Sequence, residues 1–537
     1  MTKQKKNNNP AEGTDLHDTG KFNFLNKKYF IIGFYILVIV FLFFPLLMKP
    51  GNSPDSISQA YPAYLYNKAE LIQHGSIPFW YPYISGGTPY LEGFHFNHLF
   101  DFLVYVFPVD LGIGYRYIFF VLLAGWLAYL FFQSLGFSRA ISFIAGLVYM
   151  LSGDAVSYIS PGHYGKIVNM AFLPLTLMFI NYGFDKRKYV YFLFAGLGLS
   201  FMFRGHPQLF YYNILIISLY FMFKFILSYQ ESKEKKLIRF FFLGYGLMGL
   251  VAVLCAFDNL FHQFQFVKMT SRGTETDVMA KWEFATSWSK HPLELFTYFM
   301  PSLWGLQNQT YMGWMPFVST TDYTGLLVVL IALFGIAMNW KNKYIKFFSI
   351  ITVLAVLFGM GKFFPSFYKL FYFYVPNISK FRVPSTIYIT VAFFLVYFFT
   401  YGLKSILEFN YLEDRNKKKI YCFIAAILFL CFCFTLFVNS DSYHALLKEN
   451  LGTRMDLKAM YTRYEPVQVD NYINNILNGN VTMAKDNLGS LWIFSLLLSA
   501  ILLLLANRKI KIKTFLFILT ILIFIDLYVV DKQFITP

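Results

Sequence analysis

The sequence predicts an all-α polytopic membrane protein with about thirteen transmembrane helices and long extracytoplasmic loops that carry short interfacial helices. Hydrophobic residues make up 57% of the 537 positions and charged residues only 14%, which is far from the average of soluble domains. Apolar runs of about 20 residues, the length that crosses a bilayer, recur along the chain. Basic residues gather in alternate connections between these runs, as expected for a multi-pass topology.

Each predicted span is an apolar run close to the required length. The thirteen runs are 30–48, 114–133, 138–152, 167–183, 189–203, 207–227, 237–257, 321–339, 344–360, 383–403, 420–438, 488–506 and 512–530. The first run is followed by Lys-Pro-Gly, not by a small-residue cleavage site, so we expect a retained anchor. Three shorter runs, 99–107, 293–303 and 364–375, have proline at or near their ends and are predicted to be interfacial or re-entrant.

Charge predicts the orientation. With the N-terminus inside, the inner segments hold 27 Lys and Arg against 9 acidic residues, and the outer segments hold 19 against 20. This asymmetry satisfies the positive-inside rule and places the C-terminus outside. The basic excess then faces anionic lipid of the inner leaflet, so no nucleic-acid partner is predicted. We expect a multi-pass protein of a bacterial inner membrane, with the lipid bilayer as its surroundings.

The orientation also divides the chain. A polar tail, 1–28, is expected to be cytoplasmic and disordered, and 29–537 forms one membrane domain. The long loops, 49–113, 258–320, 361–382 and 439–487, all fall outside, which predicts that any chemistry takes place on the extracytoplasmic face. The four cysteines lie within apolar runs, so neither a disulfide framework nor a thiolate metal site is predicted. No nucleotide-binding or hydrolase motif is present.

The first outer loop supplies the leading candidate for a catalytic acid, Asp55. A carboxylate at the lip of a membrane cavity can act as a general base because partial desolvation raises its pKa. A solvated loop acid is the alternative. The loop also contains Glu92, His95, His98 and Asp101; a divalent cation is conceivable there, but the spacing matches no metal template and no metal site is predicted. The aromatic turn with Trp80 and Tyr81 is expected to frame the cavity.

Two further outer turns carry ionisable groups next to apolar runs. One has Asp154, His163 and Lys166, and the other has Arg204, His206 and Gln208. Ionisable residues at membrane depth are functional candidates, although long side chains also reach the interface by snorkelling.

The two later outer loops complete the candidate set. Arg272 and Glu283 lie in a tryptophan-rich segment suited to stacking on sugar rings or to lying among lipid headgroups. Arg382 directly precedes a predicted span. Because guanidinium matches the geometry of phosphate, Arg382 and Arg204, with Lys166, are the predicted contacts to an anionic headgroup. A polyprenyl-phosphate sugar is a donor that such an enzyme finds already in the membrane.

Five segments in order resemble the YfhO-like bacterial membrane proteins, which are related to lipid-linked-sugar glycosyltransferases of the GT-C fold class. They are PFWYPYISGGTPYLEG (78–93), PGHYGKIVNMAFLPL (161–175), RGHPQLFYY (204–212), SRGTETDVMAKWEFATSWSKHPLELFTYFMPSLWG (271–305) and KFRVPSTIYI (380–389). The resemblance implies transfer of a sugar from undecaprenyl phosphate to a cell-envelope acceptor, in some members a teichoic-acid polymer. It also implies an essential acid in the first outer loop, where Asp55 lies and Asp154 and Asp101 are rivals. Larger family members continue into an extracytoplasmic domain, which this chain, ending at Pro537, is expected to lack.

These observations lead to one hypothesis and two alternatives. The hypothesis is a polyprenyl-phosphate-dependent glycosyltransferase that acts on a polymer or glycolipid, with Asp55 as general base. The predicted phosphate contacts are Arg382, Arg204 and Lys166, and the predicted cavity residues are His163, His206, Gln208, Trp80, Tyr81, Glu283 and Arg272. A lipid or polysaccharide transporter and a non-catalytic envelope-assembly protein are the alternatives.

Overall fold

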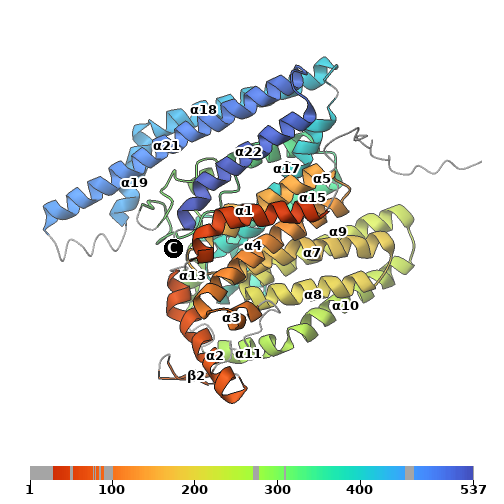
Figure 1. Ribbon diagram of the computed structural model, residues 1–537, viewed down its shortest axis with the longest axis vertical. Helices are drawn as coiled ribbons and strands as arrows, with labels where there is room; N and C mark the ends of the chain where they lie inside the picture. Colours follow the sequence, from red (N-terminus) through yellow and green to blue (C-terminus); the bar gives the residue numbers. More distant parts are fainter. Residues whose placement is uncertain are drawn as a thin grey trace, which may run out of the picture.

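The computed structural model describes residues 28–48, 53–76, 78, 80–83, 86–89, 101–269, 277–307, 310–409, 411–453 and 465–535. The predicted tail, 1–28, lies outside this part of the chain except for its last residue. The described chain is mostly helical, with one small two-stranded hairpin and an irregular segment between residues 299 and 325 (Figure 1).

Ten helical segments of the described chain are long and apolar enough to cross a membrane, which indicates a polytopic membrane protein. Their apolar length explains why they form, since a spanning segment must satisfy every backbone hydrogen bond within itself. The helices are α1 (Lys28–Met48), α4 (Val109–Ser134), α5 (Arg139–Met150) continued by α6 (Gly153–Ser157), α7 (Tyr164–Lys186), α9 (Pro207–Ser232), α10 (Lys236–Cys255), α17 (Tyr388–Glu408) preceded by η6 (Pro384–Ile387), α18 (Asp414–Val438), α21 (Pro466–Ala506), and α22 (Ile512–Asp531) followed by η7 (Lys532–Phe534).

The other three predicted spans form shorter helices. They are α8 (Val190–Gly205), α14 (Leu326–Met338) and α15 (Lys343–Gly359), of 16, 13 and 17 residues. Every predicted span therefore corresponds to a helix, but the number of thirteen membrane crossings stays a prediction. The predicted span 321–339 starts too early, because α14 begins only at Leu326, after Gly325 at a φ of 102°.

Short elements lie at the ends of these helices. The three short runs predicted to be interfacial overlap with α3 (Phe102–Val106), η3 (Pro292–Tyr298) and α16 (Pro365–Tyr374). The remaining elements are η1 (Ser56–Ala60), α2 (Tyr61–His74), β1 (Trp80–Tyr81), β2 (Thr88–Pro89), α11 (Phe257–Met269), α13 (Val278–Thr286), η4 (Gly361–Phe363), η5 (Ile378–Lys380) and α19 (Asp441–Thr453). The predicted loop 439–487 differs most from the structure, because α19 and the first half of α21 occupy most of it.

The core is built around α4, α7 and α17. Helix α7 packs against α4 and α8, and α17 packs against α14. Glycines allow the closest approaches, since a Cβ on Gly402 of α17 would collide with the carbonyl oxygen of Ile331 on α14. Small residues serve the same purpose at many helix contacts in membranes.

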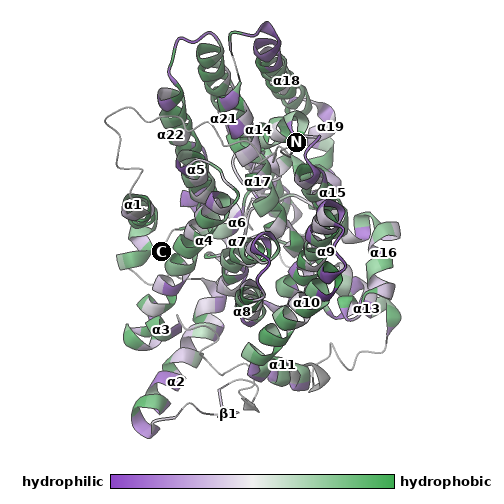
Figure 2. Ribbon diagram, turned by 90° about the vertical axis from the view of Figure 1, so that its right-hand side faces the viewer, coloured by the Kyte–Doolittle hydropathy of each residue, from purple (hydrophilic) through white to green (hydrophobic). Residues whose placement is uncertain are grey.

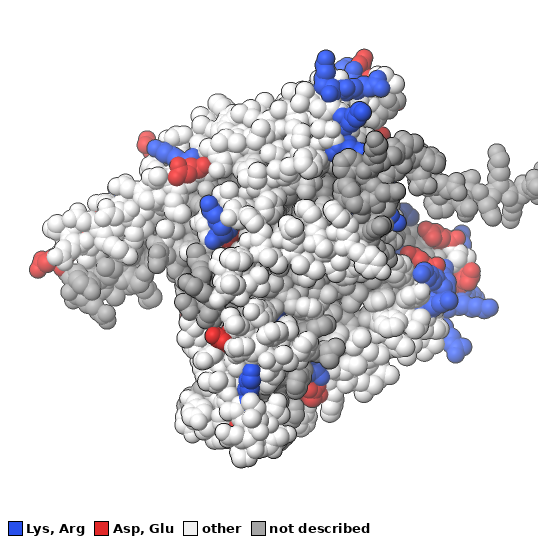
Figure 3. All heavy atoms as spheres, viewed as in Figure 1, with Lys and Arg blue, Asp and Glu red and all other residues white. Residues whose placement is uncertain are grey.

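Hydrophobic residues follow the length of the helices, and hydrophilic residues gather at their ends (Figure 2). Lys and Arg side chains are concentrated at one end, where the turns between α9 and α10 and between α17 and α18 lie (right in Figure 3). Helices α1, α4 and α7 run from this basic end to the other end of the bundle. Elements η1 and α2, which follow α1, and α6, which precedes α7, lie at that other end. The candidate site is at that second end.

Candidate functional site

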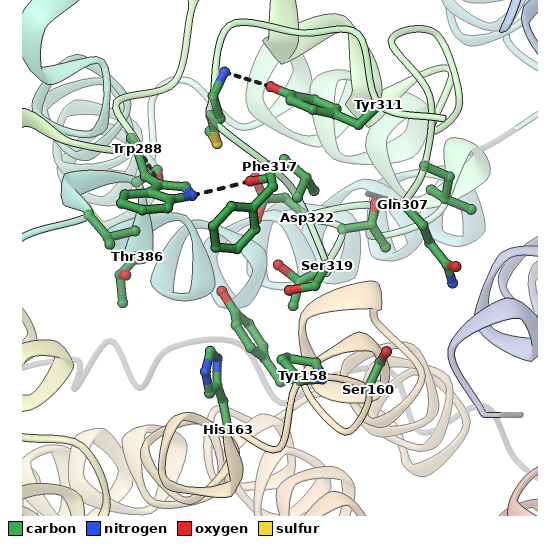
Figure 4. Close-up of a pocket in the computed structure, with 18 of the residues that line it drawn as sticks. Tyr158, Ser160, His163, Trp288, Gln307, Tyr311, Phe317, Ser319, Asp322 and Thr386 are labelled. Atoms are coloured by element: carbon green, nitrogen blue, oxygen red, sulfur yellow. Dashed lines mark hydrogen bonds between the residues drawn. The ribbon is translucent and has the colours of Figure 1, made fainter. Parts of the chain in front are cut away.

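A cavity of about 760 Å³ opens at the end of the bundle away from the basic turns. Four segments that are distant in sequence form its wall: the start of the first outer loop, the turn before α7, the segment 288–322 and the segment that leads into α17. Figure 4 shows Tyr158 and His163 on one side and Trp288, Phe317 and Asp322 on the other. The cavity thus brings together residues from most of the predicted outer clusters.

Asp55 lies at the lip of this cavity and pairs with His163. The distance from Oδ2 of Asp55 to Nε2 of His163 is 3.0 Å, and both side chains are partly exposed. The backbone fixes the two segments side by side, since the amide of Asp55 donates to the carbonyl of Pro161 at 3.4 Å. Gly162, at a φ of 95°, allows this approach, because a Cβ there would press on Ser53 and Ser56.

The protonation of His163 follows from its surroundings. Burial and the neighbouring Lys166 lower the pKa of His163 to about 4, although Asp55 acts in the opposite direction. His163 is therefore neutral near pH 7. The hydrogen bond between its Nε2 and the Asp55 carboxyl group holds the two side chains in orientation.

Two cations of the cavity have no ion pair within the described residues. Lys166 lies in the first turn of α7 with its Nζ 4.5 Å from the centre of the Tyr158 ring. Arg382 lies before η6 with its guanidinium carbon 5.6 Å from the centre of the Trp288 ring. Aromatic faces attract cations, and they leave the N–H groups of both side chains available to an anion. The arrangement is suited to phosphate.

The wall formed by 288–322 carries charged groups that the sequence did not single out. Lys290 pairs with Asp322, and both side chains are mostly buried. Glu294 accepts hydrogen bonds from the Tyr311 hydroxyl and from the backbone of His291. Burial raises the pKa of Glu294. Asp322 was not predicted as a site residue because hydropathy placed it inside the predicted span 321–339. Lys290 was not predicted either, because its position in the sequence matches no motif.

Asp154, the second predicted catalytic acid, does not line the cavity but lies fully buried behind its wall. Its helix, α6, is attached to the extended segment 321–323 by a hydrogen bond of 2.7 Å from the amide of Gly153 to the carbonyl of Tyr323. Asp322, Lys290 and Lys166 are close enough to act on Asp154 electrostatically. Asp154 is therefore placed to influence the cavity and not to contact a ligand there.

The turn between α8 and α9 lies beside the cavity. Arg204 donates to the carbonyl of Cys255 at 2.8 Å and pairs with Asp258, so the structure does not place it with Lys166 and Arg382. His206 caps α9 by accepting from the amide of Leu209 at 3.1 Å. These two roles explain why ionisable residues stand at the membrane boundary here.

The remaining predicted cavity residues are also placed elsewhere. Gln208 donates to the backbone carbonyl of Arg382 instead of lining the cavity. Trp80 and Tyr81 form the two-residue strand β1, which pairs with β2 and does not line the cavity. Glu283 is exposed on α13. Arg272 lies outside the described residues.

Asp101, the other rival acid, is committed to a buried pair. Its carboxylate lies 3.0 Å from Nη1 of Arg116, and neither side chain is exposed. The possible cation ligands Glu92, His95 and His98 lie outside the described residues. Within the described part of the chain, no group of three or more His, Cys, Asp or Glu residues is arranged to hold a metal ion.

No model of a known protein family matches this chain, and a search of curated proteins finds no matching sequence.

Proposed function

We propose that this protein transfers a sugar from a polyprenyl-phosphate donor to a cell-envelope acceptor on the extracytoplasmic face of a bacterial inner membrane. One observation carries the proposal: a cavity at the end away from the basic turns holds both a carboxylate, Asp55, and two cations that form no ion pair with any residue the structure describes, Lys166 and Arg382. The positive-inside rule places the basic turns in the cytoplasm and therefore this cavity outside. The resemblance to YfhO-like proteins leads to the same activity.

Each group has a role in the proposed reaction. Asp55 accepts the proton of the acceptor hydroxyl as the hydroxyl oxygen forms a bond to the anomeric carbon of the sugar. The bond from that carbon to the phosphate oxygen breaks, and the electron pair leaves with the polyprenyl phosphate. Arg382 and Lys166 stabilise the negative charge of the departing phosphate. His163 keeps Asp55 oriented, and Arg204 has no part in this scheme.

The aromatic lining fits a sugar. Tyr158, Trp288, Tyr311 and Phe317 all contribute to the cavity wall. Their rings offer apolar faces, and tyrosine and tryptophan also carry a hydrogen-bonding group. The polyprenyl tail would lie along the apolar surfaces of the helices.

The test measures release of polyprenyl phosphate, the product common to every sugar and acceptor. The purified protein in lipid nanodiscs is supplied with a panel of undecaprenyl-phosphate sugars and a cell-envelope extract as acceptor. We expect Asp55→Asn to lower turnover by roughly 100-fold or more, the range for loss of a general base. Asp486→Asn, an exposed position on α21, is the matched control and should retain turnover. Undiminished turnover in a folded Asp55→Asn protein would remove Asp55 from its role, and binding of the donor without turnover in the wild-type chain would favour a non-catalytic protein.

A further inference from the structure

Two residues of the cavity wall have an unusual backbone conformation. Trp288 has a φ of 54° and Val383 a φ of 59°, in the left-handed region that disfavours residues other than glycine. For Val383 the conformation is a marked outlier because its side chain is branched at Cβ. Such conformations persist only where the surroundings impose them, and they cluster at functional sites.

The surroundings of these two residues are a set of hydrogen bonds that ties them to each other. The amide of Val383 donates to the carbonyl of Ser287 at 3.1 Å. The hydroxyl of Ser385 donates to the carbonyl of Trp288 at 2.8 Å. The indole of Trp288 in turn donates to the carbonyl of Phe317 at 3.2 Å (dashed in Figure 4). The segment before α17 is thereby joined to the wall at 288–317.

Gln208 holds this junction from outside the cavity. Its Nε2 donates to the carbonyl of Arg382 and, at 3.2 Å, to the carbonyl of Val383. The same amide reaches the hydroxyl of Tyr212, one turn further along α9, at 2.9 Å. One side chain thus fixes two consecutive peptide groups on either side of the Val383 Cα.

These contacts determine where the Arg382 side chain points. The φ angle of Val383 sets the direction of the preceding chain relative to η6, so a relaxed Val383 would aim Arg382 elsewhere. In the observed conformation Arg382 lines the cavity, and its guanidinium lies over the Trp288 ring. The strained backbone of Val383 therefore places Arg382 at the cavity. Arg382 is one of the two cations that have no ion pair within the described residues.

We propose that Gln208, Val383 and Trp288 form a clamp that positions Arg382 to bind a phosphate-bearing ligand in the cavity. All three are positioning residues, and Arg382 is the residue that contacts the ligand. The identity of that ligand as a lipid-linked donor rests on the proposed function, whereas the clamp itself requires only a phosphate group. A lipid phosphate and a free phosphate compound share this chemistry.

A double-mutant cycle tests the coupling. The dissociation constants of undecaprenyl phosphate in detergent micelles and of inorganic pyrophosphate are measured for the wild type, Gln208→Leu, Arg382→Gln and the double variant. Gln208→Leu is expected to weaken binding roughly three- to tenfold, the cost of immobilising one long side chain. In the Arg382→Gln background it should change binding by less than about twofold, because Gln208 acts through Arg382. Gln133→Leu is the matched control, since Gln133 also donates to a backbone carbonyl but lies far from the cavity in sequence and packing.

Thermal stability provides a measurement that needs no ligand. Val383→Gly should melt no lower than the wild type and should bind the same probe about as tightly, because glycine adopts positive φ without strain and so keeps the direction of Arg382. Val318→Gly, a cavity position without positive φ, should melt lower. Additive effects of Gln208→Leu and Arg382→Gln, or a Val383→Gly protein that melts as far below the wild type as Val318→Gly does, would overturn the clamp. Coupled binding of pyrophosphate without binding of the lipid would support the clamp and contradict the lipid donor; binding of neither probe would contradict both.

Discussion

The burial of His163 beside Lys166 makes the stability of the protein depend on pH. The folded protein holds the pKa of His163 at about 4, below its ordinary value of 6.5. Between these two values the unfolded chain binds a proton that the folded chain does not, so stability is lost as the pH falls through this window. Above pH 6.5 the histidine is neutral in both states and makes no such contribution.

We therefore expect the melting temperature of the wild type in detergent to fall between pH 7 and pH 4.5, and His163→Gln to reduce this fall. Glutamine keeps an N–H group near the position of Nε2 but does not titrate. Melting is followed by intrinsic fluorescence at both pH values. His74→Gln, on the exposed side of α2, should behave as the wild type does, and an equal fall in His163→Gln would show that another group causes the pH dependence.

Substitution of Asp101 is expected to lower the stability of the protein, whereas substitution of Asp55 is expected to lower its turnover. Asp101→Asn leaves the buried charge of Arg116 without its carboxylate, and breaking a buried ion pair typically costs about 3–5 kcal/mol. The guanidinium of Arg116 also lies 3.6 Å from the centre of the Tyr164 ring, next to His163, so the loss would reach the cavity. We expect Asp101→Asn to melt well below the wild type, while Asp486→Asn melts with it. A stable Asp101→Asn protein without turnover would instead identify Asp101 as the catalytic acid.

At the scale of the helices, glycine contacts determine how closely α14 and α17 approach. Gly402→Ala would place a Cβ against the carbonyl of Ile331, and Gly335→Ala would do so against the carbonyl of Phe398. Backbone atoms cannot move aside as side chains do, so we expect each change to cost about 1–3 kcal/mol of stability. Gly249→Ala on α10, where a Cβ meets nothing within 4 Å, should be neutral or stabilising by up to about 1 kcal/mol. Melting of the three variants in detergent measures the difference, and equal behaviour would contradict the close packing.

The helices and the site residues also show how much of the structure could be predicted from the sequence. Hydropathy located a helix for every expected span because apolar length is a local property. Asp55, His163, Lys166 and Arg382 were predicted as site residues because each is ionisable and adjoins an apolar run, and the structure places all four around one cavity. Asp322 and Lys290 could not be found in this way, since their pairing joins segments that only the fold brings together. The same limit applies to Arg204, whose partner Asp258 lies at the start of another helix.

For the whole molecule, the distribution of charge predicts which end faces the cytoplasm. The turns rich in Lys and Arg lie at one end of the bundle (Figure 3), and the cavity lies at the other. Basic connections are retained on the cytoplasmic side during insertion, and a polyprenyl-phosphate donor and its envelope acceptor would meet on the opposite side. The proposed function therefore requires that the end of the bundle with the cavity faces the outside of the cell.

Cysteine labelling in intact cells checks this orientation. Single cysteines are introduced at Glu449 on α19 and at Lys188 between α7 and α8, both exposed, in a chain whose four native cysteines are replaced by alanine. We expect a membrane-impermeant maleimide to label Glu449→Cys in intact cells, and Lys188→Cys only after the membrane is permeabilised. Labelling both after permeabilisation shows that each thiol is reactive. Labelling of Lys188→Cys alone in intact cells would show that the cavity faces the cytoplasm. An extracytoplasmic acceptor could then not reach Asp55.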